Sequence, residues 1–528
     1  MAAPIYSPVV KPMAHQRKAL ELSREKEFFA YFMDTRTGKS KVVIDDVGYL
    51  YAKGLIDCAI LAGPNGLQRN WKDQIVAHID PKIVWHCYMW ERAPTPKYLQ
   101  REIEAFKART SGLLFFIVNM EAIGNQAYDH IDDLLEAKRC YLAIDESHRI
   151  GDPKTLVAKC LLKLGKKALY RRALSGTPDG GDPVKLFSQY RFLSPSILDS
   201  DSLSAFKAEY CQLLDENHPL IQHTARKIAS KNPKMHIDKV KKIIQIVERD
   251  REGRPIYRNL DKLDRLTRPH VFRVKKADCF DLPRKTFDIR YVELTKRQQS
   301  IYDLVSTETE AEFIHQKQLR TITTAIAITR ILRGQQIVGN YYTPDPPANF
   351  DFEIPKKETI RIEKPEDNPR LQAALDIIEE GGRAPTVIWT RFRPEIDELV
   401  HALQAKYGAA KAAFIDGRVQ GEVREKVRKD FLAGKIDFLV IQTRAGIGFD
   451  LYRAETVIYY SNTFSAIDRV QSEDRTDSIQ RKHPVAVFDI QAIGTVDKTI
   501  IDCQKMRKDI AEILYGGNNR VVDILKGE

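Results

Sequence analysis

Short apolar runs that alternate with helix-length segments constrain the fold of this chain more than any other feature. These runs are "EFFAYF" (27–32), "CAILA" (58–62), "LLFFIV" (113–118), "YLAI" (141–144), "RRALSG" (171–176), "TVIWT" (386–390), "AAFID" (412–416), "DFLVIQ" (437–442), "TVIYYS" (456–461) and "VAVFDI" (485–490). Runs of about four to six apolar residues between turn signals suit strands that are buried on both faces. The sequence therefore predicts an α/β fold with two tandem parallel-sheet domains.

The length of the chain also favours more than one domain, because 528 residues exceed what a single hydrophobic core usually organises. No apolar run is long enough to span a bilayer and no signal peptide is recognisable, so we expect a cytoplasmic protein without a membrane partner. The seven cysteines form no C-x-x-C pair, which fits neither a disulfide framework nor a zinc site. The net charge of +12 is compatible with nucleic-acid binding and equally with an ordinary basic surface.

Two segments depart from the strand pattern. Residues 197–270 are mostly helical in pattern and rich in basic residues, and a solvated helical protrusion is favoured there over a dedicated DNA contact. Residues 341–369 are rich in proline and charge, which is typical of a linker or a small hairpin insertion. We expect a first lobe over 1–284 with a helical protrusion at about 197–270, a second lobe over 285–515 with a helical protrusion and irregular insertion at about 295–369, and a tail over 516–528.

The stretch "MDTRTGKS" (33–40) ends like a phosphate-binding loop but has Met33 where the usual pattern has glycine. It follows a predicted strand and precedes a predicted helix, the context in which a helix N-terminus and backbone N–H groups point at phosphates. Gly38 lets the backbone approach, Lys39 can reach the β and γ phosphates, and Ser40 can hold Mg²⁺. A chance Gly-Lys-Ser is the alternative, and the context favours the nucleotide site.

An acidic pair follows another predicted strand in "YLAIDESH" (141–148). The carboxyl ends of parallel strands form the ligand-binding edge of such a sheet. Asp145 could hold Mg²⁺ while Glu146 acts on the attacking water. The alternative is a polar turn after a strand, and the upstream Gly-Lys-Ser loop favours the functional interpretation.

The order of these motifs resembles helicase superfamily 2, and more closely its Snf2 family, over about residues 12–490. The similar stretches of the first half are "KPMAHQRKAL" (11–20), "AILAGPNGLQRNWKDQI" (59–75), "IVNME" (117–121), "ALSGTPDGG" (173–181), "LFSQYRFLSPSIL" (186–198), "FKAEY" (206–210) and "HVFRVKKADCFDLPRKTFDIRYVELTKRQQSIYDLV" (270–305). In the second half they are "VIWTRF" (387–392), "IQTRAGIGFDL" (441–451) and "QSEDRTDSIQR" (471–481). The resemblance implies two RecA-like lobes.

The resemblance also implies a role for particular residues. Arg475 would act as an arginine finger beside the catalytic Lys39 and Glu146. Nucleotide binding would involve Gln16, Thr37, Gly38, Lys39, Ser40, Gly446, Gly448 and Asp450, with Ser40 and Asp145 on the metal. Nucleic acid would meet Pro64, Asn70, Trp71, Asn119, Thr390, Arg391 and Thr443, and Ser175 and Thr177 would couple hydrolysis to lobe movement.

The chain departs from the family pattern at a few positions. Arg36 stands where the loop often has glycine, and the stretch at 441–451 is one residue shorter than usual. Ser478 replaces the second arginine of the last motif, so Arg475 is expected to act as the sole finger, with Arg481 as a substitute.

The resemblance implies ATP and Mg²⁺ as cofactors and a monomeric DNA-dependent ATPase that moves on DNA. It is closest to the compact phage and bacterial type, in the cytoplasm of a bacterium or a phage-infected host. Duplex or branched DNA is favoured over RNA, and replication, recombination or repair proteins are possible partners. One alternative is a slow-hydrolysing nucleic-acid clamp or sensor, and another is a helicase acting on RNA or branched DNA.

Overall fold

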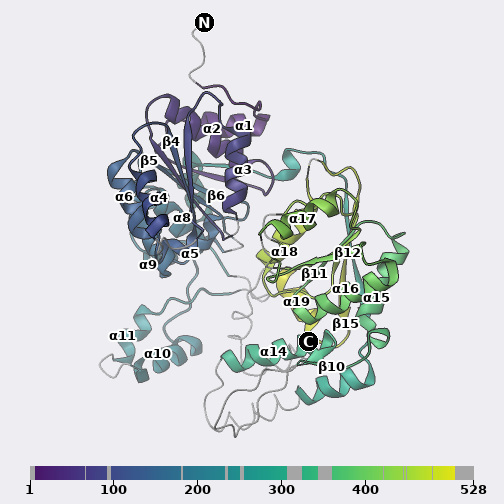
Figure 1. Ribbon diagram of the computed structural model, residues 1–528. Helices are drawn as coiled ribbons and strands as arrows, with labels where there is room; N and C mark the ends of the chain where they lie inside the picture. The colour runs from purple at the N-terminus through teal and green to yellow at the C-terminus, as the bar shows by residue number, and fades with distance from the viewer. Residues whose placement is uncertain are drawn as a thin grey trace. The chain divides into compact units, whose positions relative to one another are not determined.

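A computed structural model describes most of the chain. The described residues are 6–65, 67–91, 97–179, 182–231, 236–249, 255–305, 324–342, 359–419, 421–443, 445–446, 449–478 and 480–505. They belong to two compact units, Met1–Phe280 and Asp281–Glu528, drawn in Figure 1. Gly448 and the predicted tail at 516–528 lie outside the described residues. The division of the sequence into lobes at 284 and 285 stays a prediction.

The first unit is built on a parallel sheet of seven strands in the order β3-β4-β2-β5-β6-β1-β7. The strands are β1 (Phe28–Met33), β2 (Cys58–Gly63), β3 (Trp85–Met89), β4 (Leu113–Asn119), β5 (Cys140–Asp145), β6 (Tyr170–Ser175) and β7 (Val271–Val274). Central strands such as β2 are buried along their whole length, which explains their unbroken apolar sequence.

Helices cover both faces of this first sheet. The helices are α1 (Ala14–Ser23), α2 (Lys39–Ala52), α3 (Gln68–His78), α4 (Lys97–Lys107), α5 (Met120–Ile123), α6 (Tyr128–Ala137), α7 (Leu156–Gly165) and α8 (Leu186–Leu193). Apolar side chains of α1 to α3 pack on one face, and those of α4 to α8 pack on the other. This three-layer arrangement is the one predicted for a parallel sheet.

Beyond α8, the first unit continues into a helical segment before it returns to the sheet at β7. It contains α9 (Leu203–Tyr210), α10 (Pro219–Lys231), α11 (Ile237–Ile243) and α12 (Leu260–Thr267). Isolated antiparallel bridges join residues of its two ends, including Cys211 to Tyr257 and Leu213 to Val247. In Figure 1, α10 and α11 stand apart from the helices that cover the first sheet.

The second unit has a parallel sheet of six strands in the order β12-β13-β11-β14-β15-β8. The strands are β8 (Lys285–Val292), β11 (Thr386–Thr390), β12 (Ala412–Ile415), β13 (Phe438–Gln442), β14 (Thr456–Tyr459) and β15 (Val485–Ala492), and a separate pair joins β9 (Tyr341–Tyr342) to β10 (Ile360–Arg361). The helices are α14 (Thr324–Val338), α15 (Pro369–Glu380), α16 (Arg393–Tyr407), α17 (Gly421–Leu432), α18 (Ala466–Glu473) and α19 (Val496–Lys505). Two tandem parallel-sheet α/β domains, the RecA-like arrangement, are therefore confirmed.

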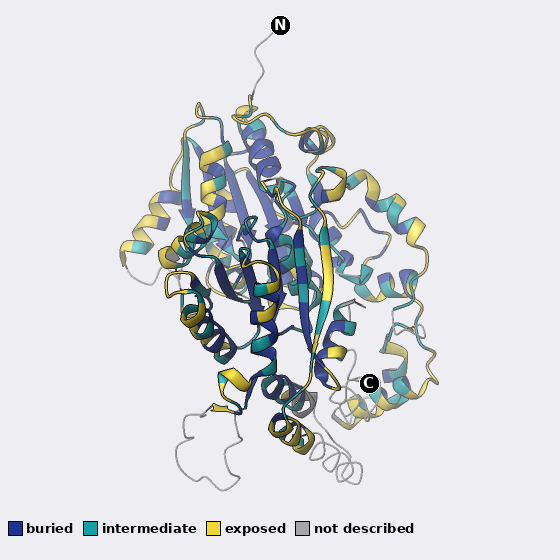
Figure 2. Cartoon of the chain, turned by 90° about the vertical axis from the view of Figure 1, so that its right-hand side faces the viewer, coloured by how far each residue is buried: buried dark blue, intermediate teal, exposed yellow. Residues whose placement is uncertain are grey.

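Edge strand β8 is the most exposed strand of the second sheet, as Figure 2 shows. Phe287 is 59% exposed and Tyr291 is 57% exposed, whereas β11 at the centre is buried along its whole length. Among the residues that the structure describes, no helix has the length and apolar character needed to cross a bilayer.

A buried polar cluster fixes α2 to the first sheet. Asp46 of α2 accepts hydrogen bonds from Tyr31 of β1 (3.2 Å), Tyr141 of β5 (3.1 Å) and Arg172 of β6 (3.0 Å). The Arg172–Asp46 ion pair is fully buried, so removing one partner would leave an uncompensated charge in the core. The cluster therefore ties α2 to three strands whose carboxyl ends carry the candidate site.

Candidate functional site

The loop between β1 and α2 adopts a backbone that depends on glycine at one position. Gly38 has φ +85°, in the left-handed region, and a Cβ atom there would lie 2.1 Å from Nε2 of Gln16. Arg36 also has positive φ (68°), a conformation that is strained for a residue with a side chain. Arg36 thus holds a backbone region that glycine adopts without strain.

Gln16 is placed against this loop by contacts at both ends of its amide. Its Nε2 donates to the carbonyl oxygen of Thr37 (3.1 Å), and its Oε1 accepts from the backbone N–H of Met13 (3.0 Å). The Nε2 atom of His15 lies 2.8 Å from the same Thr37 oxygen. These contacts hold the loop directly before α2, and a role of Gln16 in nucleotide binding stays a prediction.

The N-terminus of α2 has the character of an anion site. The helix lacks a side-chain cap and has no acidic residue in its first turn, so its first N–H groups are not satisfied by the helix itself. Lys39 donates from Nζ to the backbone oxygens of Met33 (2.8 Å) and Asp34 (3.3 Å), both neutral acceptors. The ammonium and the backbone donors can therefore receive phosphate oxygens, and the hydroxyl of Ser40 is suited to a hard cation such as Mg²⁺.

The acidic pair lies at the carboxyl end of β5. Burial and the neighbouring Glu146 charge raise the pKa of Asp145 to about 6, while Lys39 and a hydrogen bond from Trp71 act in the opposite direction. The backbone N–H of Glu146 donates to Oδ1 of Asp145 (3.0 Å). A carboxylate that is costly to keep charged suits a divalent cation, which would stabilise its ionised form.

The resemblance placed Trp71 among the residues that meet nucleic acid, and in the structure Trp71 lies in the interior beside the acidic pair. It is only 2% exposed, and its side chain hydrogen-bonds Asp145. Of the other first-unit candidates, Pro64 follows β2 and is buried, Asn70 is exposed on α3, and Asn119 caps α5 by accepting from Ala122 N–H at 2.7 Å. Contact of these residues with nucleic acid stays a prediction.

The sequence analysis assigned no role to His148, yet His148 joins the acidic pair to the next strand. Its Nδ1 lies 3.1 Å from Oγ of Ser175 and 3.3 Å from Oε2 of Glu146. Oγ of Ser175 also accepts the N–H of Thr177 (3.1 Å), and burial lowers the pKa of His148. The position of His148 directly after "DES" was the available signal, and its contact with Ser175 required the tertiary structure.

Gln189 of α8 was also missed. It accepts from Oγ of Ser147 (2.7 Å) and donates to the backbone oxygen of Pro178 (2.6 Å). It therefore links the turn after β5 to the turn after β6 from a third element. The predicted coupling pair, Ser175 and Thr177, lies within this network.

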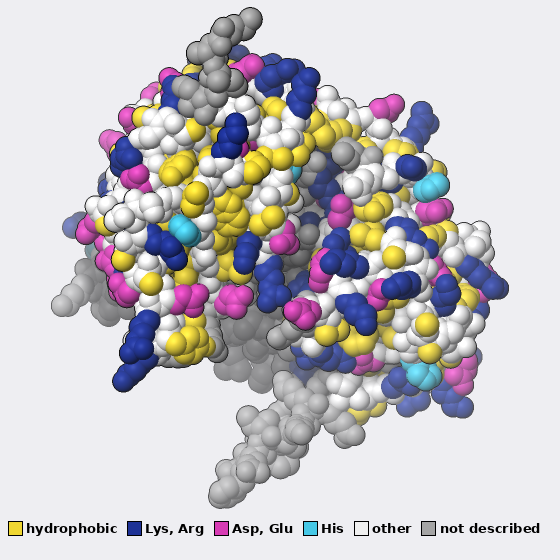
Figure 3. Space-filling model, turned by 45° about the horizontal axis from the view of Figure 1, so that its top comes forward, with side chains coloured by type: hydrophobic (Ala, Val, Ile, Leu, Met, Phe, Trp, Pro, Cys, Tyr) yellow, Lys and Arg dark blue, Asp and Glu magenta, His cyan; other side chains and the backbone are white. Residues whose placement is uncertain are grey.

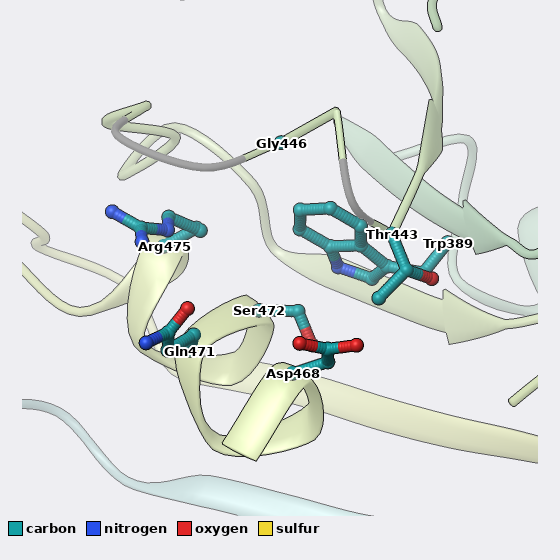
Figure 4. Close-up of a pocket in the computed structure, with 7 residues that line it drawn as sticks. All are labelled: Trp389, Thr443, Gly446, Asp468, Gln471, Ser472 and Arg475. Atoms are coloured by element: carbon teal, nitrogen blue, oxygen red, sulfur yellow. The ribbon is translucent and has the colours of Figure 1, made fainter. Parts of the chain in front are cut away.

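The second unit brings a different set of candidates together. Trp389, Thr443, Gly446, Asp468, Gln471, Ser472 and Arg475 line one small pocket, shown in Figure 4. Arg475 follows α18 and is 7% exposed. Thr443 donates from Oγ1 to the backbone oxygen of Thr390 (3.0 Å). One pocket of this unit is thus lined both by Thr443, which was predicted to meet DNA, and by Gly446 and Arg475, which were predicted to lie near the nucleotide.

The remaining second-unit candidates lie outside that pocket. Arg391 donates to the side chain of Gln335, and Asp450 is partly buried beyond the turn. Ser478 is 8% exposed, and Arg481 donates to the backbone oxygen of Pro283 within the same unit. One nitrogen of the Arg481 guanidinium is therefore bonded inside the second unit, while its Nε and Nη1 have no hydrogen-bond partner among the described residues.

Surface charge is mixed on the face drawn in Figure 3. Figure 3 shows Lys and Arg interspersed with Asp and Glu on the face in view, rather than gathered into one continuous basic stripe. The net charge of +12 alone therefore identifies no nucleic-acid track on that face.

Two RecA-like lobes, the first with a Gly-Lys-Ser loop and an acidic pair at one sheet edge, define the class of helicase-like nucleoside triphosphatases. The SNF2-related domain matches residues 30–341, and the Helicase conserved C-terminal domain matches residues 369–480. The chain therefore belongs to the Snf2 family of helicase superfamily 2.

Several curated proteins are similar to this chain. The TATA-binding protein-associated factor BTAF1 of Arabidopsis thaliana is 22% identical over 74% of this chain and 20% of its own length. An uncharacterised ATP-dependent helicase of Mycoplasma genitalium is 24% identical over 88% of this chain and 38% of its own length. The RAD54-like DNA repair and recombination protein of Drosophila persimilis is 20% identical over 88% of this chain and 57% of its own length. The chain thus spans between a fifth and three fifths of these relatives.

A solved structure, the Sulfolobus solfataricus SWI2/SNF2 ATPase core in complex with dsDNA, is also similar. It shares 18% identity with this chain, covers all of it and 99% of its own chain, and has a TM-score of 0.39.

Proposed function

We propose that this protein is an ATP-dependent DNA translocase that hydrolyses ATP between its two lobes while it moves on DNA. The observation that carries the proposal is the first-unit site, where Lys39, the uncapped start of α2 and Asp145 converge at one sheet edge. Membership of the Snf2 family supports it. Curated relatives named as helicases or DNA repair proteins support nucleic acid as the partner.

In this proposal, MgATP is held by residues of both units. The backbone around Gly38, the ammonium of Lys39 and the hydroxyl of Ser40 receive the phosphates and the cation, and Asp145 completes the metal site. MgATP supplies the bond whose hydrolysis drives movement. Glu146 orients the attacking water, and Arg475 from the second unit stabilises the developing negative charge.

Closure of the lobes would then be required for turnover, because the proposed machinery is divided between two units. Ser175 and Thr177 would transmit this movement, a role supported by the contacts of His148 with Ser175 and Glu146. Thr390, Arg391 and Thr443 would hold one DNA strand mainly at its phosphates. Binding should therefore depend weakly on sequence and fall with salt.

The test is steady-state ATPase activity with and without duplex DNA. We expect DNA to raise the rate, and Lys39→Ala to lower kcat by about 10²-fold or more through loss of charge stabilisation. Lys159→Ala on the exposed face of α7 is the matched control and should behave as wild type. An ATPase rate that DNA leaves unchanged, or that survives Lys39→Ala, would contradict the proposal.

A slow-hydrolysing clamp or sensor is a second candidate, favoured by one specific observation. Ser478 occupies the position of the second arginine, and Arg481 is turned towards the Pro283 carbonyl oxygen. Normal DNA affinity with negligible turnover would select this candidate. Comparing stimulation by single strands, duplexes, forks and RNA would identify the preferred nucleic acid and test the helicase alternatives.

A further inference from the structure

The turn after β13 is packed against Trp389 so closely that only glycine fits at position 446. A Cβ atom on Gly446 would lie 2.4 Å from Cζ3 and 2.5 Å from Cη2 of the Trp389 ring. The φ of Gly446 lies outside the left-handed region, so its backbone conformation does not itself demand glycine. The requirement for glycine is therefore steric and comes from the tryptophan.

The Trp389 ring cannot easily move away from this turn. It is fully buried in β11, at the centre of the second sheet, and is paired in register with Ile441 and Tyr459. Its indole N–H has no hydrogen-bond partner among the described residues. A buried donor without a partner is unfavourable by about 1–3 kcal/mol, so the shape of the ring rather than its polar atom explains its use here.

On its other side the ring faces α18, as Figure 4 shows, where Asp468, Gln471 and Ser472 line the same pocket as Trp389. The helix is itself held firmly. Ser472 lies 2.8 Å from the hydroxyl of Tyr459, and Arg469 pairs with Asp489. Trp389 therefore lies between two segments, the turn at 443–446 and the helix that leads to Arg475.

We propose that Trp389 is a positioning residue that sets the spacing between α18 and the turn that carries Thr443 and Gly446, and so couples nucleic acid at Thr443 to the placement of Arg475. This inference rests on the proposed function for the roles of Thr443 and Arg475. A shift of the turn towards β11 would bring the backbone at Gly446 against the edge of the ring, because the two already lie in close contact. The ring thus limits how closely the turn can approach the small pocket that Trp389 shares with α18.

A double-mutant cycle tests the contact without reference to ATP. We expect Gly446→Ala to lower the apparent Tm by about 5 °C through overpacking. The same change made in a Trp389→Leu chain should lower it little, because the obstructing ring is gone. Gly417→Ala is the control, since a Cβ there meets only the flexible end of Arg393 at 3.3 Å. Additive effects of the two substitutions would overturn the contact.

The coupling is tested by the ratio of DNA-stimulated to unstimulated kcat. We expect Gly446→Ala and Trp389→Leu each to lower this ratio by about tenfold, while in Trp389→Leu the KM for ATP and the DNA affinity change much less. Trp389→Phe, which keeps a ring and removes the unpaired N–H, should retain most of the ratio. The double variant Gly446→Ala/Trp389→Leu should show a ratio of DNA-stimulated to unstimulated kcat that is no lower than the ratio of either single variant.

The outcomes separate this inference from the proposed function. A non-additive Tm cycle with an unchanged stimulation ratio would make the contact purely structural, which overturns the positioning role and leaves the translocase proposal intact. A wild-type chain without DNA-stimulated turnover would overturn the proposed function, and the coupling role with it. Trp389→Phe provides a well-packed variant if the leucine substitution prevents folding.

Discussion

The two lobes each contain a strand, a turn and a helix N-terminus at the sheet edge, but only one of these helix ends is open to a ligand. In the first lobe, α2 begins after Gly38 with no side-chain cap and no acidic residue in its first turn. In the second lobe, α16 begins after Phe392 and is capped by its own Glu395. Glu395 accepts from the backbone N–H groups of Arg391 (3.3 Å) and Phe392 (3.2 Å).

The difference shows how one architecture can be specialised for binding or for support. The carboxyl group of Glu395 engages the N–H groups of the two residues that precede α16, so it lies at a helix start where an external anion could otherwise lie. At the start of α2 the third helical residue is Lys41, which is paired with Asp45. Phosphate binding is thus expected at the start of α2 rather than at the start of α16, and the second lobe is proposed to contribute side chains such as Arg475.

The largest expected effect concerns the second lobe. Arg475→Ala should lower kcat by about 10³-fold, because an arginine finger stabilises charge that develops only during phosphoryl transfer. Equilibrium binding of a fluorescent ATP analogue, measured in parallel, should change little, since the phosphate loop belongs to the first lobe. Loss of nucleotide binding with unchanged kcat would contradict this division of labour.

The next effect is a pH dependence of stability at the internal cap. Burial raises the pKa of Glu395 from 4.5 to about 7, so between these pH values the folded chain holds a proton that the unfolded chain has released. Stability should therefore fall as pH rises through this window, by about 2–3 kcal/mol. In urea titrations Glu395→Gln should lack this component, and parallel profiles for the two proteins would exclude it.

A smaller effect is expected at the open helix end. Gly38→Ala should raise the Kd for ATP by about tenfold, because a left-handed residue with a Cβ is strained by about 1–2 kcal/mol and the methyl would meet Gln16. Gly434→Ala, also at positive φ but in the second lobe, is the matched control for strain alone. Equal losses of ATP affinity in both variants would indicate general destabilisation rather than a damaged site.

The smallest effect uses a simple anion. Inorganic pyrophosphate at ten times its Kd should raise the Tm by about 3 °C through binding to the native state. Lys39→Ala should abolish the shift, and Glu395→Gln should leave it intact. A shift that is lost in Glu395→Gln but kept in Lys39→Ala would reverse the comparison between the lobes.

The central strands were predictable from sequence, and several edge strands were not. Runs such as "CAILA" indicate strands buried on both faces, whereas β3, β7 and β8 were absent from the strands predicted from the sequence. These three strands lie at sheet edges, where a strand is less buried and needs no continuous apolar run. The sequence signal weakens where burial weakens.

Site residues divide in the same way. The loop at 33–40 and the acidic pair were recognisable because their spacing along the chain is itself the signal. The burial of Trp71 against Asp145 and the fit of Gly446 to Trp389 depend on contacts between segments far apart in sequence. Such contacts leave no local pattern, so they required the fold.

The connection between the two sheets has a further consequence. The last strand of the first sheet ends at Val274 and the first strand of the second begins at Lys285, so residues 275–284 connect the sheets over at most about 35 Å when extended. Part of this connection, Lys276–Asp278, is helical and is bonded to Asp34 of the first unit, which shortens its reach. A connection this short would keep the two halves of the proposed site at an effective concentration of the order of millimolar. Assembly of the proposed site is then an intramolecular event whose frequency does not depend on how dilute the protein is.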